Sequence, residues 1–225
     1  MDREHLDTAI QQIRDYTNEH LELRAAHHFL YDLPLDRKAG KPEVVIMGVN
    51  PGETEYDRRA YPGPTEQTYY HDFHEKATSG RSRANRNWNR NAVFFANGKS
   101  VVFTEMFFWS SGDGEELKQR YGSLWESRHL SFCIAMNRLL IGEYRPQSVI
   151  FTGLSHWRRV ANAFDLEHVR TVRDGRWRLV EHYQDGFRPW FITKHWSGSF
   201  GFSNDQKDAI RQYMRMASAS NITAS

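Results

Sequence analysis

The sequence predicts an α/β protein with three layers, α/β/α, built on a central, mainly parallel sheet of four or five strands. Short runs of consecutive apolar residues, bounded by glycine or proline, are typical of strands buried on both faces. They alternate with longer segments whose apolar residues recur at helical spacing, and strands separated by helices favour right-handed crossovers and a parallel sheet. With 225 residues, the chain is expected to form a single domain over 1–225.

Each expected element follows from its own pattern. The apolar runs predict strands or strand-like segments, in chain order at 44–47, 101–108, 148–152, 168–173, 177–183 and 190–194. Apolar residues at helical spacing predict helices at 3–30 (one or two), 84–97, 127–141, 154–164 and 205–217. Residues 1–40 are expected to be an N-terminal helical segment, and 218–225 a flexible tail.

The segment 52–82 has the composition of a long irregular loop, rich in proline, glycine and tyrosine. Loops of this length are usually functional or disordered. Three of its aromatic residues, Tyr61, Tyr70 and Phe73, are candidates to stack on a base or to roof a binding pocket. The alternative is a surface insertion that takes no part in binding.

The net charge of +2 is small, but the arginines are unevenly distributed. They concentrate at 83–90, 158–159 and 170–178, whereas the acidic residues are scattered. Such clusters suggest an anionic partner, for example nucleic acid. Many arginine clusters are only solvated helix faces, so the charge pattern alone does not identify a binding surface.

A single cysteine, Cys133, lies in an apolar run. It can form neither a disulfide framework nor a four-thiolate iron–sulfur or zinc site. We therefore expect no cysteine-rich metal cluster and a cytoplasmic location. No apolar run reaches membrane-spanning length and the charged N-terminus does not resemble a signal peptide, so we expect a soluble protein without a membrane partner.

Two of the predicted strands are followed by notable polar residues. The first continues into GVNPG at 48–52, and the last is followed by His195-Trp196-Ser197. In a parallel sheet both strands end at the same edge, where open α/β sheets bind ligands, so Asn50 and His195 can converge on one crevice. Asparagine before Pro-Gly is also common turn chemistry, and either residue alone is weak evidence of function.

This ordered pair of motifs resembles the uracil-DNA glycosylase superfamily. Its members carry a G-x-N-P-G type motif after the first strand, in the mismatch-specific and single-strand-selective branches, and an H-P-S-like motif after the last strand. The resemblance covers 44–203 in matching order. It implies a uracil-DNA-glycosylase-like fold and the activity of a monofunctional DNA glycosylase. Such an enzyme needs no metal or cofactor, and we expect the protein to be a monomer. Such an enzyme hydrolyses the N-glycosidic bond of a flipped-out base and leaves an abasic site.

The resemblance assigns the catalytic roles to Asn50 and His195. Hydrolysis of a nucleoside's glycosidic bond produces a sugar cation and an anionic leaving base, so a donor aimed at a base oxygen stabilises the transition state. His195 fits this role, and the neutral amide of Asn50 can orient the attacking water. Gly48 and Val49, next to Asn50, are expected to belong to the base-binding pocket.

Residues beyond the last strand are candidates for DNA contacts. Ser197 and Ser199 can hold phosphates through hydroxyl and backbone donors, although serines beside glycine are usually turn formers. Phe200 and Phe202 come next, at the place where family members carry a residue that wedges into the duplex. The alternative is that these two phenylalanines pack in the core. We also expect Arg83, Arg86 and Arg90, from the arginine cluster at 83–90, to contact DNA phosphates.

Glu105 departs from the family pattern. Members that read uracil commonly carry an asparagine, often as Thr-Asn, at the strand end where this sequence has Thr104-Glu105. An ionised carboxylate lacks the hydrogen-bond donor that a uracil carbonyl requires. A pocket that leaves one polar group of the base unmatched discriminates poorly for that base. A glutamate that is protonated by burial suits the exocyclic amine and the ring nitrogen of cytosine. The alternative is that Glu105 pairs with an arginine and does not contact the base.

The substrate class is left open between several readings. Superfamily members that remove modified cytosines from phage DNA, including glucosylated hydroxymethylcytosine, act in antiviral defence, and Glu105 and the long loop are compatible with that role. Excision of uracil or mismatched bases in DNA repair is the alternative. A nucleic-acid-binding module without catalysis, or a nucleoside hydrolase using the turn at 48–52 as an anion cradle, belongs to other classes, and that turn lacks the lysine of a phosphate loop.

Overall fold

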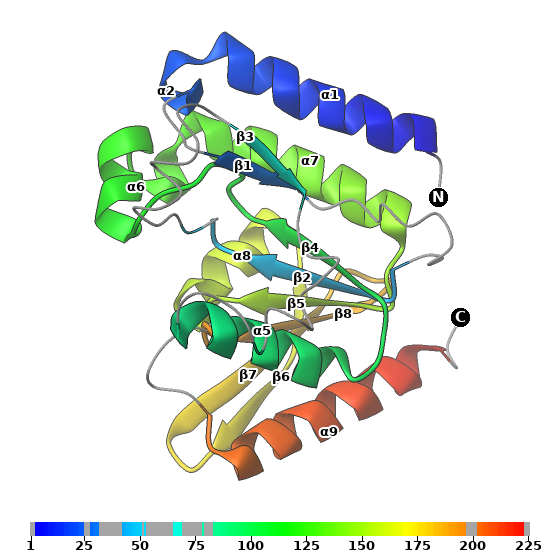
Figure 1. Cartoon of the computed structure of the whole chain (residues 1–225). Helices are drawn as coiled ribbons and strands as arrows, with labels where there is room; N and C mark the ends of the chain where they lie inside the picture. Colours follow the sequence, from blue (N-terminus) through cyan, green and yellow to red (C-terminus); the bar gives the residue numbers. More distant parts are fainter. Residues whose placement is uncertain are drawn as a thin grey trace. The chain divides into compact units, whose positions relative to one another are not determined.

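The computed structural model describes residues 3–24, 28–31, 42–50, 52, 65–68, 78, 83–196 and 202–222 (Figure 1). The chain forms two compact units whose segments alternate along the sequence. Unit 1 consists of Met1–Pro34, Gly48–Tyr69 and Phe103–Arg145, and unit 2 of Leu35–Met47, Tyr70–Val102 and Pro146–Ser225. Whether both units belong to one folding domain, as the sequence suggests, stays a prediction.

A six-stranded, mostly parallel sheet confirms the predicted α/β class. The strands are β2 (Val44–Gly48), β4 (Val101–Glu105), β5 (Ser148–Thr152), β6 (Glu167–Asp174), β7 (Trp177–Gln184) and β8 (Pro189–Thr193). Their order is β4-β2-β5-β8-β7-β6. Strands β2, β5 and β8 are parallel to one another, and β7 is antiparallel to both β8 and β6. Every residue of β2, β5 and β8 is buried, which explains why these strands read as unbroken apolar runs.

The predicted number of four or five strands is wrong, because the β6–β7 hairpin adds two antiparallel strands next to β8. Its turn places Gly175 at a φ of 53°, a backbone conformation that favours glycine. The tight turn allows the two strands to pair from Glu167 opposite Gln184 to Asp174 opposite Trp177.

A second, two-stranded sheet corrects the expected N-terminal helical segment. Strand β1 (His28–Tyr31) pairs in parallel with β3 (Thr65–Thr68), and both belong to unit 1. The helices before it are α1 (Arg3–Glu19) and α2 (Leu21–Arg24). Two predictions are therefore wrong over these short strands: the helix that extends to residue 30 and the wholly irregular loop at 52–82. Pairing between distant segments overrides the local sequence pattern there.

The remaining predicted helices are confirmed. They are α5 (Arg83–Ala96), α7 (Arg128–Tyr144), the short η2 (Leu154–His156) followed by α8 (Trp157–Ala163), and α9 (Asn204–Ile222). Two further short elements, α6 (Gly114–Tyr121) and η1 (Leu124–Glu126), precede α7. Helix α9 continues through 218–222, where the sequence predicts a flexible tail.

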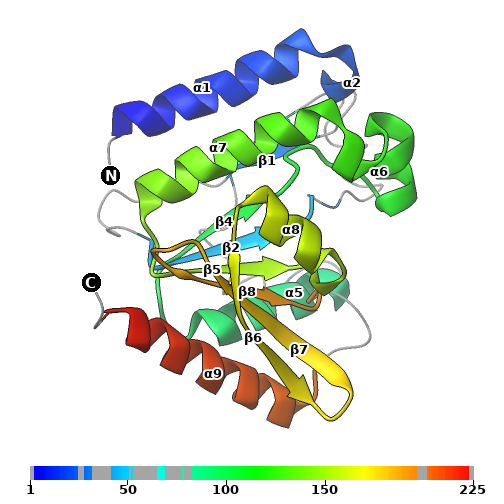
Figure 2. The ribbon, with the colours of Figure 1, turned by 180° about the vertical axis from the view of Figure 1, so that it is seen from behind.

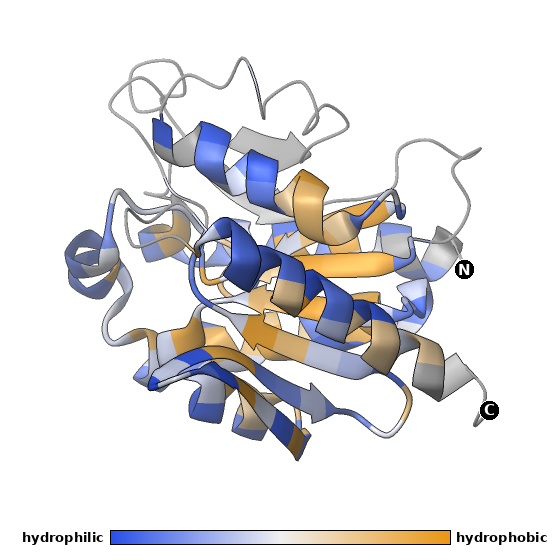
Figure 3. Ribbon diagram, turned by 90° about the horizontal axis from the view of Figure 1, so that it is seen from below, coloured by the Kyte–Doolittle hydropathy of each residue, from blue (hydrophilic) through white to orange (hydrophobic). Residues whose placement is uncertain are grey.

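In unit 2, helices pack on both faces of the strands (Figure 2). Phe95 of α5 and Met214 of α9 line the same small cavity as Phe191 of β8. On the opposite face, the ring centroid of Phe164, directly after α8, lies 4.7 Å from that of Trp190. Because Trp190 and Phe191 are neighbours on one strand, they point to opposite faces. Figure 3 shows the hydrophobic residues concentrated on the strands that these helices cover.

In unit 1, α1 lies alongside α7. The rings of Tyr16 and Phe132 stack at 3.8 Å between centroids, and Trp109 Nε1 donates a hydrogen bond to Thr17 Oγ1 at 3.1 Å. Ile10 and Ile13 complete the buried stripe of α1. This amphipathic packing is the reason why the N-terminal helix can be recognised in the sequence.

Two buried hydrogen bonds fix the end of β4 to α7 within unit 1. Thr104 Oγ1 donates to Asn137 Oδ1 at 2.8 Å, and Asn137 Nδ2 donates to the carbonyl oxygen of Glu105 at 3.0 Å. The Asn137 side chain is fully buried. The Asn137 amide therefore uses its oxygen to hold the Thr104 side chain and its nitrogen to hold the Glu105 backbone.

Replacement of Asn137 by alanine is expected to lower the free energy of unfolding by about 2–4 kcal/mol, because a buried hydroxyl and a buried carbonyl lose their partner. Urea denaturation followed by circular dichroism measures the loss. Leu139→Ala, at an exposed position of the same helix, is the matched control and should change stability by less than about 0.5 kcal/mol. Similar losses in both variants would show that Asn137 has no special role.

Candidate functional site

The segment after β2 runs beside the segment after β4 in unit 1. The backbone N–H of Met106 donates to the carbonyl of Gly48 at 3.0 Å, and that of Phe107 donates to Val49 at 2.9 Å. A further parallel bridge joins Gly52 to Ser111. The pairing therefore continues beyond the two strands and fixes the turn that carries Asn50 against residues 106–111.

Asn50 is held by a side chain distant in the sequence. Its Nδ2 donates a hydrogen bond to Ser111 Oγ at 2.8 Å, and Ser111 Oγ donates to the carbonyl of Asp113 at 3.0 Å. Ser111 is buried, and Asn50 is half-buried. This bond orients the plane of the Asn50 amide. Ser111 is a positioning residue that the sequence analysis did not identify, because nothing in the chain links positions 61 residues apart.

The carboxyl group of Glu105 lies directly on Gly48. A Cβ atom at position 48 would lie 2.1 Å from Glu105 Oε2, closer than any side-chain atom tolerates. Gly48 is therefore needed for close approach and not for an unusual backbone conformation. The structure thus brings together two of the predicted base-binding residues, Gly48 and Glu105, through a contact that no sequence motif encodes.

Glu105 is buried, with 8% of its surface exposed, and its Oε2 has no hydrogen-bond partner among the described residues. Burial raises the pKa of its carboxyl to about 8. At pH 7 the group is therefore mostly neutral and can donate one hydrogen bond while accepting another. The alternative that Glu105 pairs with an arginine is not supported, because the described part of the chain offers it no ion pair.

His195 belongs to unit 2 and follows β8 by two residues. The residue as a whole keeps an exposed surface, yet the protein atoms around its ring desolvate it enough to lower its pKa. The imidazole is therefore mainly neutral at pH 7. A neutral imidazole donates a hydrogen bond through one ring nitrogen, which is what the stabilisation of a leaving base requires.

Trp196 anchors the backbone next to His195. Its ring is buried and stacks on Phe95 at 5.3 Å between centroids, and Trp88 lies 5.7 Å away. Asn91 Nδ2 also donates to the carbonyl of Trp196 at 3.3 Å. Helix α5 thus holds the position directly after His195. The sequence analysis did not identify Trp196 and Asn91 as positioning residues.

The remaining predicted residues are distributed as follows. Phe202 is buried and meets Phe95 edge-on at 6.3 Å between ring centroids, which favours its packing role over a wedge into DNA.

On α5, Arg83, Arg86 and Arg90 recur at spacings of three and four and share one helix face, with Arg83 and Arg90 exposed. Six predicted positions lie outside the described residues: Tyr61, Tyr70, Phe73, Ser197, Ser199 and Phe200.

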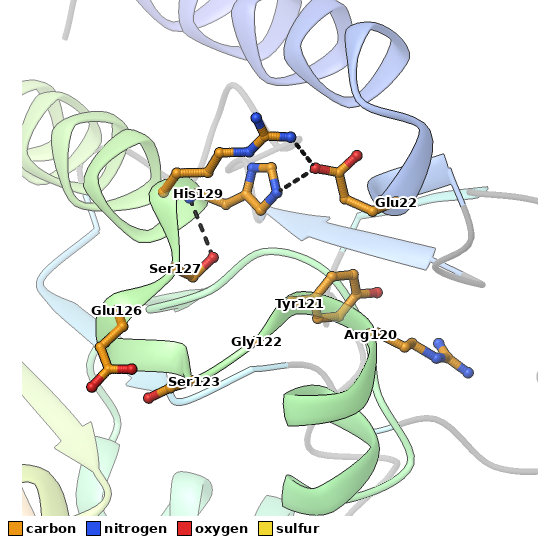
Figure 4. A pocket seen from close by; sticks show the side chains of 9 residues that line it. Glu22, Arg120, Tyr121, Gly122, Ser123, Glu126, Ser127 and His129 are labelled. Carbon is orange, nitrogen blue, oxygen red and sulfur yellow. Dashed lines mark hydrogen bonds and ion pairs between the residues drawn. The ribbon is translucent and has the colours of Figure 1, made fainter.

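A cleft of about 610 Å³ in unit 1 is lined by residues of α2, α6, η1 and α7, and none of the predicted site residues takes part (Figure 4). Glu22 Oε1 accepts a hydrogen bond from Arg128 and lies 3.1 Å from His129 Nε2. His129 Nδ1 lies 3.1 Å from the Tyr16 hydroxyl. The bond from Arg128 lowers the pKa of Glu22 to about 2. Because Glu22 and both ring nitrogens of His129 are engaged, this cluster ties α1 and α2 to α7.

The described residues contain no group of three or more histidine, cysteine, aspartate or glutamate side chains that could hold a metal ion. Within the same residues, no helix has the length and apolar character needed to cross a membrane.

The stability of the protein is expected to fall between pH 5 and pH 8 because of Glu105. Its folded-state pKa lies above the unfolded value of 4.5, so the stabilisation from protonation is complete below pH 4.5 and is lost as the pH rises towards 8. Glu105→Gln removes this titration. The free energy of unfolding of Glu105→Gln relative to wild type should therefore rise by on the order of 2–3 kcal/mol between pH 5 and pH 8.

Urea denaturation at both pH values measures this difference. Glu115→Gln, on the exposed face of α6, is the control and should show no comparable change with pH. If Glu105→Gln kept a constant difference from wild type, the carboxyl would not be protonated in the folded state.

No protein-family model matches this sequence, and the search of curated proteins gives no significant match.

Proposed function

We propose that this protein is a DNA glycosylase that hydrolyses the N-glycosidic bond of a flipped-out base. The observation that carries the proposal is the buried Glu105 carboxyl, which has no partner at Oε2 among the described residues and lies on Gly48. A buried polar group without a partner costs stability, and such groups concentrate at functional sites. Asn50 follows Gly48 by two residues in the same unit.

The proposed reaction uses neutral groups throughout. The Asn50 amide, whose Nδ2 is bound to Ser111, orients a water molecule for attack on the sugar carbon. His195 donates a hydrogen bond to the base oxygen as the glycosidic electrons pass to the leaving base. The lowered pKa of His195 is compatible with this assignment, because a neutral imidazole keeps one N–H that can donate to the base oxygen. The attacking water forms the new C–O bond and gives up one proton, and the leaving base takes up one proton, so the products are the neutral base and an abasic site.

The proposed substrate is a cytosine-type base. A protonated Glu105 carboxyl can donate to the ring nitrogen of cytosine while its second oxygen accepts from the exocyclic amine. A modified cytosine in phage DNA, such as glucosylated hydroxymethylcytosine, fits this proposal, and the biological role would then be antiviral defence. We also propose that the whole chain has the three-layer, uracil-DNA-glycosylase-like architecture, with helices on both faces of β5 and β8 in unit 2 as support.

The direct experiment is incubation of the protein with DNA that contains uracil, a mismatched base or glucosylated hydroxymethylcytosine, followed by alkali cleavage at abasic sites. Asn50→Ala and His195→Ala should each reduce base release at least a hundredfold with little change in DNA affinity, because both groups act on the transition state. Asn162→Ala and His5→Ala, at exposed positions, are the matched controls and should retain activity. Near wild-type rates in both active-site variants would refute the proposed reaction centre, and DNA binding without base release would indicate a binding module.

Glu105 is expected to decide between cytosine-type and uracil substrates. Glu105→Gln keeps the size but replaces the acidic O–H donor with a weaker amide N–H, and it should raise the barrier for excision of the cytosine-type base by about 1–3 kcal/mol. Glu105→Asn should shift the preference towards uracil, because its shorter amide supplies a donor and an acceptor. Single-turnover excision rates on both substrates test this. Robust uracil release by wild type, or equal losses on all substrates, would contradict the cytosine assignment.

A further inference from the structure

The β6–β7 hairpin extends beyond the end of β8 at the edge that carries His195. Val180 of β7 pairs with Thr193, the last residue of β8, so residues 177–179 continue past the end of that strand. Lys194 and His195 follow Thr193 directly and leave the sheet beside this extension. Figure 2 shows the turn of the hairpin projecting from the strands of unit 2. The hairpin therefore flanks His195 within a single unit.

The start of β7 presents an exposed aromatic ring between two cations. Trp177 keeps 54% of its surface exposed, which is unusual for tryptophan. The Arg176 guanidinium lies 4.9 Å from the ring centroid, and Lys194 Nζ lies 5.6 Å from it. The ring is thus held by cation–π contacts while much of it faces solvent. An exposed ring with cations beside it is suited to stack on a nucleic-acid base and to bind the adjacent phosphates.

A basic cleft of about 310 Å³ lies on the same unit. It is lined by Ser155, Trp157, Arg158, Arg159 and Arg178. The guanidinium carbons of Arg158 and Arg178 each lie 4.8 Å from the Trp157 ring centroid, so two cations are held on one aromatic side chain. Arg178 is also bonded to the buried Glu181 at 2.7 Å, which fixes its position. Among the described residues, none that lines the cleft carries a carboxylate.

The cleft and the exposed ring belong to one edge of the sheet. Trp157 and Arg158 come shortly after β5, which is parallel to β8 and ends with Thr152 opposite Thr193. Arg178 lines the cleft and is the residue directly after Trp177. The residues that follow β5, those that follow β8 and those that open β7 therefore lie at the same edge as His195.

Trp177 and Arg178 are neighbours on β7, so the exposed ring and the cleft lie on opposite faces of that strand at this edge. We propose that the two sites together bind single-stranded DNA that passes around the edge. We call their residues, Trp157, Arg158, Arg176, Trp177, Arg178 and Lys194, the arginine–tryptophan surface. The arginine guanidinium groups bind the phosphodiester backbone, since their planar fork matches two phosphate oxygens. Trp177 stacks on an unpaired base, whose face is accessible in a single strand but covered in a duplex. Binding of single-stranded DNA does not require the proposed glycosylase function. Only the expectation that the bound strand leads to His195 rests on that function.

The test measures binding of the full chain to unmodified DNA, so it does not depend on base excision. Fluorescence anisotropy at several KCl concentrations gives the dissociation constants for a labelled oligothymidylate and for a duplex of the same length. Trp177→Ala should weaken binding to the single strand by about 5- to 150-fold, which corresponds to the loss of one stacked base, and should change duplex binding much less. Trp177→Phe should retain most of the affinity, because it keeps an aromatic face.

A second variant tests the phosphate contacts. Arg158→Gln should reduce the slope of log K against log salt by about 0.7 for the single strand, as expected for one lost phosphate contact. Arg215→Gln, at an exposed position of α9 outside the surface, is the matched control and should leave both affinity and slope unchanged.

The outcomes separate this inference from the proposed function. Unchanged single-strand affinity in Trp177→Ala and an unchanged slope in Arg158→Gln would overturn the inference, whatever the excision assay shows. Equal effects on the single strand, the duplex and a polyphosphate competitor would show a general polyanion surface and would also overturn it. Selective loss of single-strand binding without any base release would support the inference and count against the glycosylase proposal.

Discussion

The contact between the Glu105 carboxyl and Gly48 is the constraint on which the candidate site depends. It requires glycine at the end of β2, because any side chain there would overlap the carboxyl oxygen. It also requires a fixed end of β4, which Asn137 supplies through the Thr104 side chain and the Glu105 backbone. An apolar residue at position 105 would fill the same buried space without the cost of an unpaired polar group. Retention of a carboxyl there is more easily explained by chemistry than by stability.

Burial sets the protonation state of Glu105 in unit 1 and, separately, that of His195 in unit 2. Burial keeps Glu105 protonated, and desolvation keeps His195 neutral, so neither carries a full charge near neutral pH. Asn50 is neutral by nature and is oriented by Ser111. Neutral, oriented dipoles stabilise developing charge with little reorganisation, and the proposed hydrolysis of a glycosidic bond would use this property.

In unit 2, aromatic residues organise the edge of the sheet around His195. Trp196 is buried against Phe95 and fixes the backbone on one side, while Trp177 is exposed on the hairpin. The difference between these two tryptophans follows from their surroundings: α5 covers Trp196, whereas the Arg176 and Lys194 cations lie over the ring of Trp177. Packing therefore explains the buried ring, whereas the exposed ring gains from contact with a partner. This contrast supports a binding role for the hairpin.

The sequence by itself determined the chain order of the six strands of the main sheet and of the longer helices, because strands buried on both faces appear as unbroken apolar runs and helices as a 3.6-residue pattern. It also placed Asn50, Glu105 and His195 directly after or at strand ends. It did not predict β1, β3, α6 and η1. Only the tertiary structure decided that Glu105 lies on Gly48, that Ser111 holds Asn50 and that Asn137 holds the end of β4, since these partners are 32 to 61 residues apart. The extra strands of the hairpin joined the sheet for the same reason, because pairing with β8 depends on backbone hydrogen bonds that leave no pattern in the side chains.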